Sequence, residues 1–338
     1  MLKKNNYLIT GGMGLIGSNI AKLLVRKQNV GKCILVDNFG GYINPLRRNY
    51  RDFRKSRFKD IFDKKISNRI KKRYVFERGD ISDFKTMLGL IEKYKPKVIF
   101  HTAAVPVAKI QNPNISEFRV GSLDTTMNLL DCVDFLKKKG KYKLSRLVYI
   151  SSSMVYGNFK KKQVSETDET NPIEIYGTIK LAGEIITKGV AQHYKIPYTI
   201  IRPSAVYGPT DMNERVTQYF LNKVINKESI KIHGKDEKLD FTYVEDIANG
   251  IIKSATHKNG INNTFNITYG KSRTLLNYVK ELGKHFKDIN YTIQKRDPFR
   301  PKRGTLSISK AKRLINYKPK YNLERGVREY IKFCKDNF

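Results

Sequence analysis

The sequence predicts an α/β protein with a parallel, doubly wound sheet and a smaller α/β domain at its C-terminal end. A glycine-rich turn stands between an apolar run and a helical pattern near the N-terminus, and five further apolar runs alternate with helical patterns up to about residue 202. Such alternation is typical of a parallel sheet with helices on both faces. Beyond residue 202 the alternation loosens, which indicates a second unit. The predicted fold class is therefore a Rossmann-type sheet followed by a substrate-binding domain.

The first apolar run leads directly into the glycine-rich turn, in the segment YLITGGMGLIGS at residues 7–18. In a strand, turn and helix of this kind, the first glycines allow the tight turn, the next lets the backbone approach a pyrophosphate, and the last lets the helix pack closely on the strand. The first amides of the helix favour phosphate because they are unpaired and carry the positive end of its dipole. The residues expected at the pyrophosphate are Gly11, Gly14, Leu15, Ile16 and Gly17.

An acidic residue ends the second apolar run, Cys33 to Val36. Asp37 lies about 20 residues beyond the glycines, where a carboxylate accepts hydrogen bonds from the ribose of adenosine. It repels a 2′-phosphate, so NAD is favoured over NADP. Asn38 follows it at the same strand end and is assigned to the same cofactor site. The alternative is that Asp37 only caps a loop.

The predicted elements follow from apolar runs and helical periodicity. Strands are expected at 6–10, 32–36, 73–78, 97–101, 145–150 and 197–201, with helices at 15–28, 83–94, 114–139 and 174–194. Further along, helices are expected at 213–227, 244–256, 274–286 and 323–335, and short strands at 230–233, 265–268 and 290–294. We assign residues 1–201 and a return segment of about 241–268 to the cofactor domain, and residues 202–240 and 269–338 to the substrate domain.

The composition limits the classes of partner that the protein is expected to bind. The 338 residues carry a net charge of +35, which invites a nucleic-acid hypothesis, but the cations are spread along the whole chain and no nucleic-acid motif accompanies them. A non-enzymatic nucleic-acid binder therefore remains only an alternative. Three distant cysteines, no signal peptide and no apolar run of about 20 residues predict a cytoplasmic protein without disulfides, metal or membrane contact.

Two side chains of one predicted helix are suited to acid–base chemistry. Tyr176 and Lys180 are four residues apart, so they lie on the same helix face. A nearby ammonium group favours the phenolate, so we expect the pKa of Tyr176 to fall below its usual value of about 10. Three serines, residues 151–153, follow the strand 145–150, where a hydroxyl can hold a reacting oxygen. A capped turn is the alternative role for these serines.

These motifs together resemble the extended short-chain dehydrogenase/reductase family, among its NAD-dependent nucleotide-sugar epimerases and dehydratases. The resemblance runs from about residue 6 to the end of the chain. It rests on TGGMGLIG at 10–17, GDI at 79–81, HTAA at 101–104, SSSMVYG at 151–157, YGTIK at 176–180, RPSAVYGP at 202–209 and DFTYVED at 240–246.

The resemblance implies roles for further residues. It places Asp80 and Ile81 at the adenine, and Ala103 and Ala104 along the cofactor. Its catalytic set falls on Ser152, Tyr176 and Lys180, of which the last two also contact NAD. The family commonly pairs through the helix that holds the Tyr/Lys pair, so a homodimer or homotetramer is expected.

The implied chemistry is NAD-dependent oxidation at C4 of a nucleotide-activated sugar. A 4-epimerase returns hydride to the other face of the ketone, and this is the main hypothesis. A 4-dehydrogenase releases the 4-keto sugar nucleotide instead, for example that of a GDP-linked sugar, and uses the same catalytic residues. A 4,6-dehydratase is disfavoured, because the family's Asp/Glu pair is replaced here by Ser153 and Met154, which lack a carboxyl group.

The nucleotide-sugar contacts follow the family only in part. The family's arginine before the Asp-Phe motif is Leu239 here, so Arg300 and Arg303 are the expected diphosphate contacts and the nucleotide base stays open. The other expected substrate contacts are Ser153, Asn213 and Arg215. Asp246 is expected to be a helix N-cap, and His101 to have no catalytic duty.

One segment has no assigned role. Residues 39–72 form a long insertion after the second strand that is rich in arginine, lysine and aromatic residues. A solvated helical insertion with its aromatic side chains turned inward is favoured over a basic helix that contacts an anionic ligand or another subunit.

Overall fold

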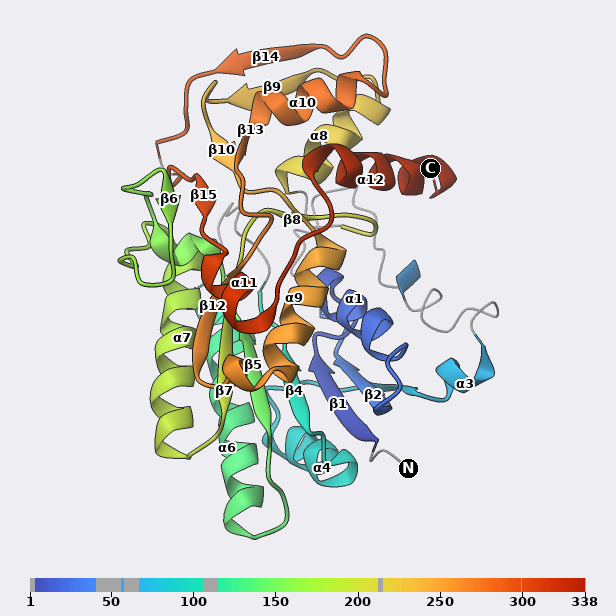
Figure 1. Cartoon of the computed structure of the whole chain (residues 1–338), viewed down its shortest axis with the longest axis vertical. Coiled ribbons are helices and arrows are strands. Elements are labelled where there is room, and N and C mark those ends of the chain that lie inside the picture. Colours follow the sequence, from blue (N-terminus) through green and yellow to red (C-terminus); the bar gives the residue numbers. More distant parts are fainter. Residues whose placement is uncertain are drawn as a thin grey trace.

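A computed structural model describes residues 4–40, 56–57, 67–105, 115–211, 215–298 and 300–337 of the chain. Its centre is a seven-stranded parallel sheet in the order β12-β7-β5-β4-β1-β2-β3 (Figure 1). The strands are β1 (Asn5–Thr10), β2 (Val30–Asp37), β3 (Tyr74–Arg78), β4 (Val98–His101), β5 (Arg146–Ile150), β7 (Tyr198–Pro203) and β12 (Asn263–Ile267). The predicted fold class is confirmed.

The strand order reverses between β1 and β4. After β1 the chain adds β2 and β3 on one side, and then crosses to add β4, β5 and β7 on the other. The register pairs Thr10 with Val36 on one side and with His101 on the other, so the carboxyl ends of these three strands lie level. Ligands bind parallel sheets outside the carboxyl ends at such a reversal.

Helices cover both faces of the sheet (Figure 1). One face packs against α1 (Leu15–Leu24), α9 (Val244–Thr256) and α11 (Ser309–Ile315). The other packs against α4 (Phe84–Tyr94), α6 (Thr125–Lys138) and α7 (Ile175–His193). A short α5 (Ile115–Phe118) and a π-helical stretch, Arg119–Asp124, lead into α6. Buried aliphatic side chains from the strands and helices form the two cores.

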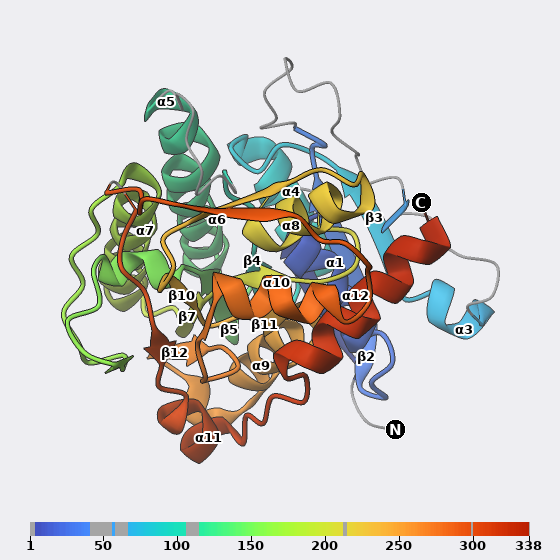
Figure 2. The same cartoon turned by 90° about the horizontal axis from the view of Figure 1, so that it is seen from above.

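The C-terminal elements form a third apolar core above the sheet (Figure 2). They comprise α8 (Val216–Ile225), α10 (Leu275–Gly283), α12 (Leu323–Asn337) and β9 (Ile230–His233). The exposed strand β14 (Tyr291–Gln294) pairs in parallel with β9. The predicted return segment, 241–268, contains α9 and β12, which pack in and against the central sheet. The chain therefore crosses back to the sheet before it completes the third core.

The shortest strands and helices were not predicted from the sequence. The two-residue strands β6 (Gln163–Val164), β8 (Val206–Tyr207), β10 (Lys238–Leu239), β11 (Thr242–Tyr243), β13 (Arg273–Thr274) and β15 (Thr305–Leu306) were not predicted, nor were α3 (Asn68–Lys71) and α11. Elements this short carry no readable periodicity. The first helix ends at Leu24 rather than at residue 28. Residues 26–29, RKQN, are all polar and continue no apolar helix face. Among the described residues, no helix has both the length and the apolar character that a membrane crossing requires.

Candidate active site

The cofactor edge of the sheet is built by the ends of β1 to β4. Gly11 follows β1 with a φ of +63°, and a Cβ there would lie 2.8 Å from the Cα atom of Ala103, which follows β4. Only glycine tolerates both the backbone conformation and this close approach. Gly14 precedes α1, whose first turn has neither a side-chain cap nor an acidic residue. Its unpaired amide groups are suited to a pyrophosphate, so the residues present fit a dinucleotide.

Asp37 both fixes the turn and faces the solvent. Its Oδ2 accepts a hydrogen bond from the Met13 amide at 2.9 Å, and its Oδ1 accepts one from the Phe39 amide at 2.8 Å. The side chain is half-buried, and each carboxylate oxygen has a second lone pair for a ribose hydroxyl. The two roles considered for Asp37, loop cap and ribose acceptor, are therefore compatible.

We expect Asp37→Asn to weaken NAD binding by about tenfold, because a hydrogen bond to a charged acceptor contributes about 1.5–3 kcal/mol. Loss of the negative charge should also narrow the preference for NAD over NADP. Calorimetric titration with each dinucleotide measures both effects. Asp236→Asn, at an exposed position, is the matched control. An unchanged NAD/NADP ratio in Asp37→Asn would contradict the ribose assignment.

The expected adenine contacts lie beyond β3. Asn38 donates its side-chain amide to Asp80 Oδ2 at 3.1 Å, and the other oxygen of Asp80 accepts bonds from the amide and hydroxyl of Ser82. Ile81 is buried, and its carbonyl accepts a 2.6 Å bond from the Asn128 side chain. These bonds join the turn after β2 to the turn after β3.

The three predicted catalytic residues come from two elements. Ser152 follows β5 and caps a 3-10 helix, Ser153–Tyr156, by accepting the Met154 amide at 3.2 Å. Tyr176 and Lys180 lie in the first turns of α7, which Glu174 caps by accepting the amides of Tyr176 and Gly177. Lys180 Nζ donates to the carbonyl of Ile150 at 2.9 Å and lies 5.9 Å from the centre of the Tyr176 ring. The fold thus brings the predicted set together.

The expected pKa of Tyr176 is wrong in direction for the protein alone. Burial raises the pKa of Tyr176, and the positive charge of Arg215 and a hydrogen bond with Ser152 oppose this only in part. Burial and the charge of Arg215 also lower the pKa of Lys180 to about 8. Burial was the effect that helical spacing could not reveal, and it disfavours charge on both side chains.

One cavity is lined by the predicted catalytic set together with residues from the C-terminal part of the chain. Its lining includes nine of the predicted site residues: Ile16, Ala104, Ser152, Ser153, Tyr176, Lys180, Arg215, Arg300 and Arg303. It also includes Met154 and Leu239, which like Ser153 depart from the family's pattern, and Thr102, Val105 and Thr217, which the sequence did not single out. Gly11, Gly14, Leu15, Gly17, Asp37, Asn38, Asp80, Ile81 and Ala103 lie along the cofactor edge instead. Asn213 lies outside the described residues.

The charge of this cavity is one-sided. Lys180, Arg215, Arg300 and Arg303 line it, and no aspartate or glutamate is among its lining residues in the described part of the chain. Burial lowers the pKa of Arg303 to about 10, so its guanidinium group is still charged at neutral pH. A cavity with this lining attracts an anionic ligand and offers no carboxyl group for eliminating water.

The model of the NAD dependent epimerase/dehydratase family matches residues 7–268 of the chain. The chain belongs to this family. UDP-glucuronate 4-epimerase of Thermodesulfobacterium geofontis is 26% identical over 341 residues, covering 98% of this chain and 96% of that protein. UDP-glucuronate 4-epimerase 1 of Arabidopsis thaliana is 28% identical over 353 residues, covering 97% and 76%.

A solved structure of a family member agrees with these sequence matches. UDP-glucuronic acid 4-epimerase from Bacillus cereus, crystallised with UDP-glucuronic acid and NAD, superposes with a TM-score of 0.86 at 25% identity, covering 98% of this chain and 100% of that one. The chain is accordingly an NAD-dependent enzyme of the extended short-chain dehydrogenase/reductase type, within the family of nucleotide-sugar epimerases and dehydratases.

His101 and Asp246 make contacts that stabilise the fold near the site. His101 is buried between the hydroxyls of Thr10 and Thr126, at 2.9 and 3.0 Å, and burial lowers its pKa to about 3, so the ring is neutral. Asp246 is not the N-cap of α9, as the sequence suggested, because Tyr243 occupies that position. Its carboxylate instead accepts the amides of residues 320 and 321, which tie the approach to α12 onto α9.

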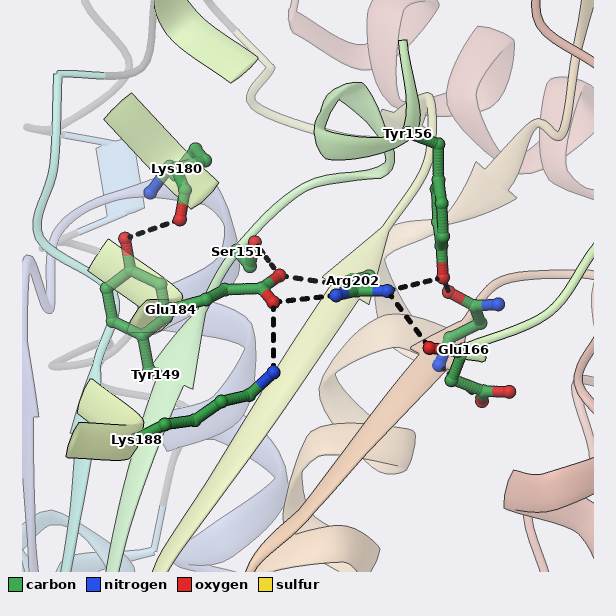
Figure 3. A network of polar contacts seen from close by, with 9 residues as sticks. Tyr149, Ser151, Tyr156, Glu166, Lys180, Glu184, Lys188 and Arg202 are labelled. Carbon is green, nitrogen blue, oxygen red and sulfur yellow. Dashed lines mark hydrogen bonds and ion pairs between the residues drawn. The ribbon is translucent and has the colours of Figure 1, made fainter. Parts of the chain in front are cut away.

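A buried ion pair lies next to Ser151, at the start of the serine segment 151–156 (Figure 3). Glu184 on α7 and Arg202 on β7 form two bonds, at 2.8 and 2.7 Å, and the side chains are 1% and 4% exposed. Ser151 donates to Glu184 at 2.6 Å, and Arg202 donates to the hydroxyl of Tyr156 at 2.9 Å. The network therefore joins α7, which carries Tyr176, to both ends of the serine segment 151–156.

Proposed function

We propose that this protein is a UDP-hexuronate 4-epimerase, which inverts C4 of a UDP-linked sugar acid through a 4-keto sugar. The observation that carries the proposal is the cationic lining of the cavity around the predicted catalytic set. The names of the similar proteins from Thermodesulfobacterium geofontis and Arabidopsis thaliana support both the nucleotide and the sugar acid.

The positions of the arginines support a sugar acid in particular. Arg300 and Arg303 follow each other closely in the C-terminal domain, where they serve the diphosphate. Arg215 instead lies near enough to the catalytic pair to influence the pKa of both Tyr176 and Lys180. The C6 carboxylate of a hexuronate is attached at C5, next to the reacting carbon. A guanidinium group beside the reaction centre matches that carboxylate.

The proposed mechanism assigns one task to each catalytic residue. Tyr176 takes the proton of the C4 hydroxyl, the Ser152 hydroxyl holds the same oxygen, and Lys180 stabilises the phenolate electrostatically. When bound, NAD supplies the hydride acceptor and a positively charged ring. The 4-keto sugar carries a carboxylate rather than a hydroxyl at C6, and Ser153 and Met154 supply no acid for an elimination, so the ketone is not dehydrated. It turns over in the cavity, and C4 is reduced on its opposite face, which inverts the configuration. Tyr176 then returns the proton to the C4 oxygen.

Proton NMR of UDP-glucuronic acid incubated with the protein and NAD tests this function. We expect the C4-inverted product to accumulate to equilibrium without net formation of NADH. Accumulation of a ketone or its hydrate, with one NADH for each ketone, would instead establish the 4-dehydrogenase alternative. A gel shift with nucleic acid that persists at physiological salt would favour the non-enzymatic alternative, because loose phosphate attraction weakens steeply with salt.

Arg215→Met is expected to raise the KM for UDP-glucuronic acid by about tenfold or more, since a charge-assisted bond contributes about 1.5–3 kcal/mol. The KM for UDP-glucose, which has no carboxylate, should change much less. The ratio of the two KM values separates carboxylate recognition from a general disturbance of the cavity. Equal losses for both sugars would remove Arg215 from the carboxylate assignment.

Assembly of the protein as a homodimer is part of the proposal. Exposed apolar side chains occur along α5 to α7 and the segments next to them, and support an interface there: Ile115, Val120, Met127, Phe135, Ile175 and Ile185. The last of these is 64% exposed, and an isolated helix would leave it in water. Sedimentation of the purified protein measures the assembly directly.

A further inference from the structure

The basic insertion after β2 contributes one side chain to the interior. Arg57 is only 1% exposed, and among the described residues it is the largest side chain that is fully buried. Arginine is almost never buried to this extent unless its guanidinium group is paired or hydrogen-bonded. The residues around this position, 41–55 and 58–66, lie outside the described part of the chain.

The guanidinium group of Arg57 joins two segments from different parts of the fold. Its Nη1 donates to the carbonyl of Met13, within the glycine-rich turn, at 2.6 Å. Its Nε donates to the Thr210 hydroxyl at 3.0 Å, and its Nη2 donates to the Thr210 carbonyl. A planar fork of donors makes such a three-point contact in one fixed geometry, which a lysine cannot reproduce.

Met13 lies in the turn expected to hold NAD, and Thr210 lies near a residue that lines the cavity. The Met13 amide is already bound to the Asp37 carboxylate, so the peptide groups on both sides of Met13 are fixed. Thr210 has a φ of +67°, a left-handed conformation that a β-branched residue adopts only under constraint from its surroundings. Five residues after Thr210 the chain reaches Arg215, which lines the cavity beside Tyr176.

We propose that Arg57 is a positioning residue that couples NAD binding to nucleotide-sugar binding. Arg57 links Asp37, through Met13, to the turn at Thr210 that leads to Arg215. A dinucleotide held by the glycine-rich turn is therefore linked through Arg57 to Thr210, five residues before Arg215. Because coupling between two ligands is reciprocal, the nucleotide sugar strengthens NAD binding by the same factor. This gives the otherwise unassigned insertion a function in the enzyme.

Calorimetric titrations of the full chain test the proposal, which rests on the proposed function only in the choice of UDP-glucuronic acid as probe. Arg57→Met should raise the Kd for NAD by about tenfold. In the unmodified protein, NAD should tighten UDP-glucuronic acid binding by about fivefold or more, and in Arg57→Met that ratio should fall to near one. Arg57→Lys should be intermediate. Arg328→Met removes an exposed arginine of α12 and should leave both quantities unchanged.

The ratio distinguishes coupling from a structural role. If a variant is only destabilised, fewer molecules are folded, but each folded molecule retains the coupling ratio. Circular dichroism shows whether Arg57→Met or Arg57→Lys is folded, and the folded variant is used for the titrations. A Kd for NAD within about twofold of the unmodified value would overturn the proposal. Weaker NAD binding with an unchanged ratio would also overturn it, because Arg57 would then only stabilise the turn. If UDP-glucuronic acid does not bind to the unmodified protein, the proposed substrate fails, and the coupling ratio is measured with UDP as the second ligand instead.

Discussion

Tyr176→Phe is expected to lower kcat by about 10³-fold, within the range that a positioned acid–base group contributes. Phenylalanine retains the ring that packs in the cavity but has no proton to exchange with the C4 oxygen. The glycine-rich turn and Asp37 remain in place, so NAD should bind within a few-fold of its normal affinity. Measurement of kcat by NMR and of the NAD Kd by calorimetry gives the two numbers that the prediction separates.

The control for this variant is Tyr291→Phe, which removes a phenol at an exposed position of β14 far from the cavity. It should have normal kcat and normal NAD affinity. Near-normal turnover of Tyr176→Phe would remove the base assignment from Tyr176. Loss of NAD binding together with turnover would show instead that Tyr176 acts mainly through the cofactor.

Glu184→Ala is expected to produce the largest loss of stability, about 3–5 kcal/mol, because it leaves the buried guanidinium group of Arg202 without its counter-ion. For a chain of this size we expect a fall in Tm of about 4–7 °C. Ser151 also loses its acceptor, so the serine segment should shift and kcat should fall in the fraction that remains folded. Thermal unfolding followed by circular dichroism measures the first effect, and turnover below the transition measures the second.

Glu169→Ala is the matched control for the buried pair. Glu169 pairs with Lys160 at 2.7 Å, but the two side chains are 63% and 72% exposed. Exposed pairs of this kind contribute between zero and about 1 kcal/mol, so the Tm should barely change. If the two variants unfold at the same temperature, burial of the Glu184–Arg202 pair does not have the importance that we assign to it.

The glycine-rich turn and the alternation of strands and helices were sufficient to predict the sheet. Residue patterns also predicted that Ile16, Ser152, Tyr176 and Lys180 would lie near one another, because all four lie at strand ends or helix starts that a parallel sheet brings to one edge. The assignment of Arg215 and Arg303 as substrate contacts followed only from the resemblance, and the position of Arg215 beside Tyr176 and Lys180 was not predicted.

Features that depend on tertiary packing could not be predicted. Helical spacing suggested a lowered pKa for Tyr176, whereas burial raises it. Nothing in the sequence around Arg57 distinguishes it from its basic neighbours, and only its contacts with Met13 and Thr210 identify it. The pairing of Glu184 with Arg202 likewise joins positions 18 residues apart that no periodic pattern connects.

The most direct test of the account uses UDP-glucuronic acid that carries deuterium at C4. If the protein oxidises and then re-reduces C4 of the same sugar, the C4-inverted product retains the deuterium, and turnover shows a primary isotope effect when the hydride step limits the rate. Mass spectrometry and NMR of the product give both results. Inverted product in which solvent hydrogen has replaced the deuterium, or a ketone released with the deuterium left on the cofactor, would contradict the proposed 4-epimerase.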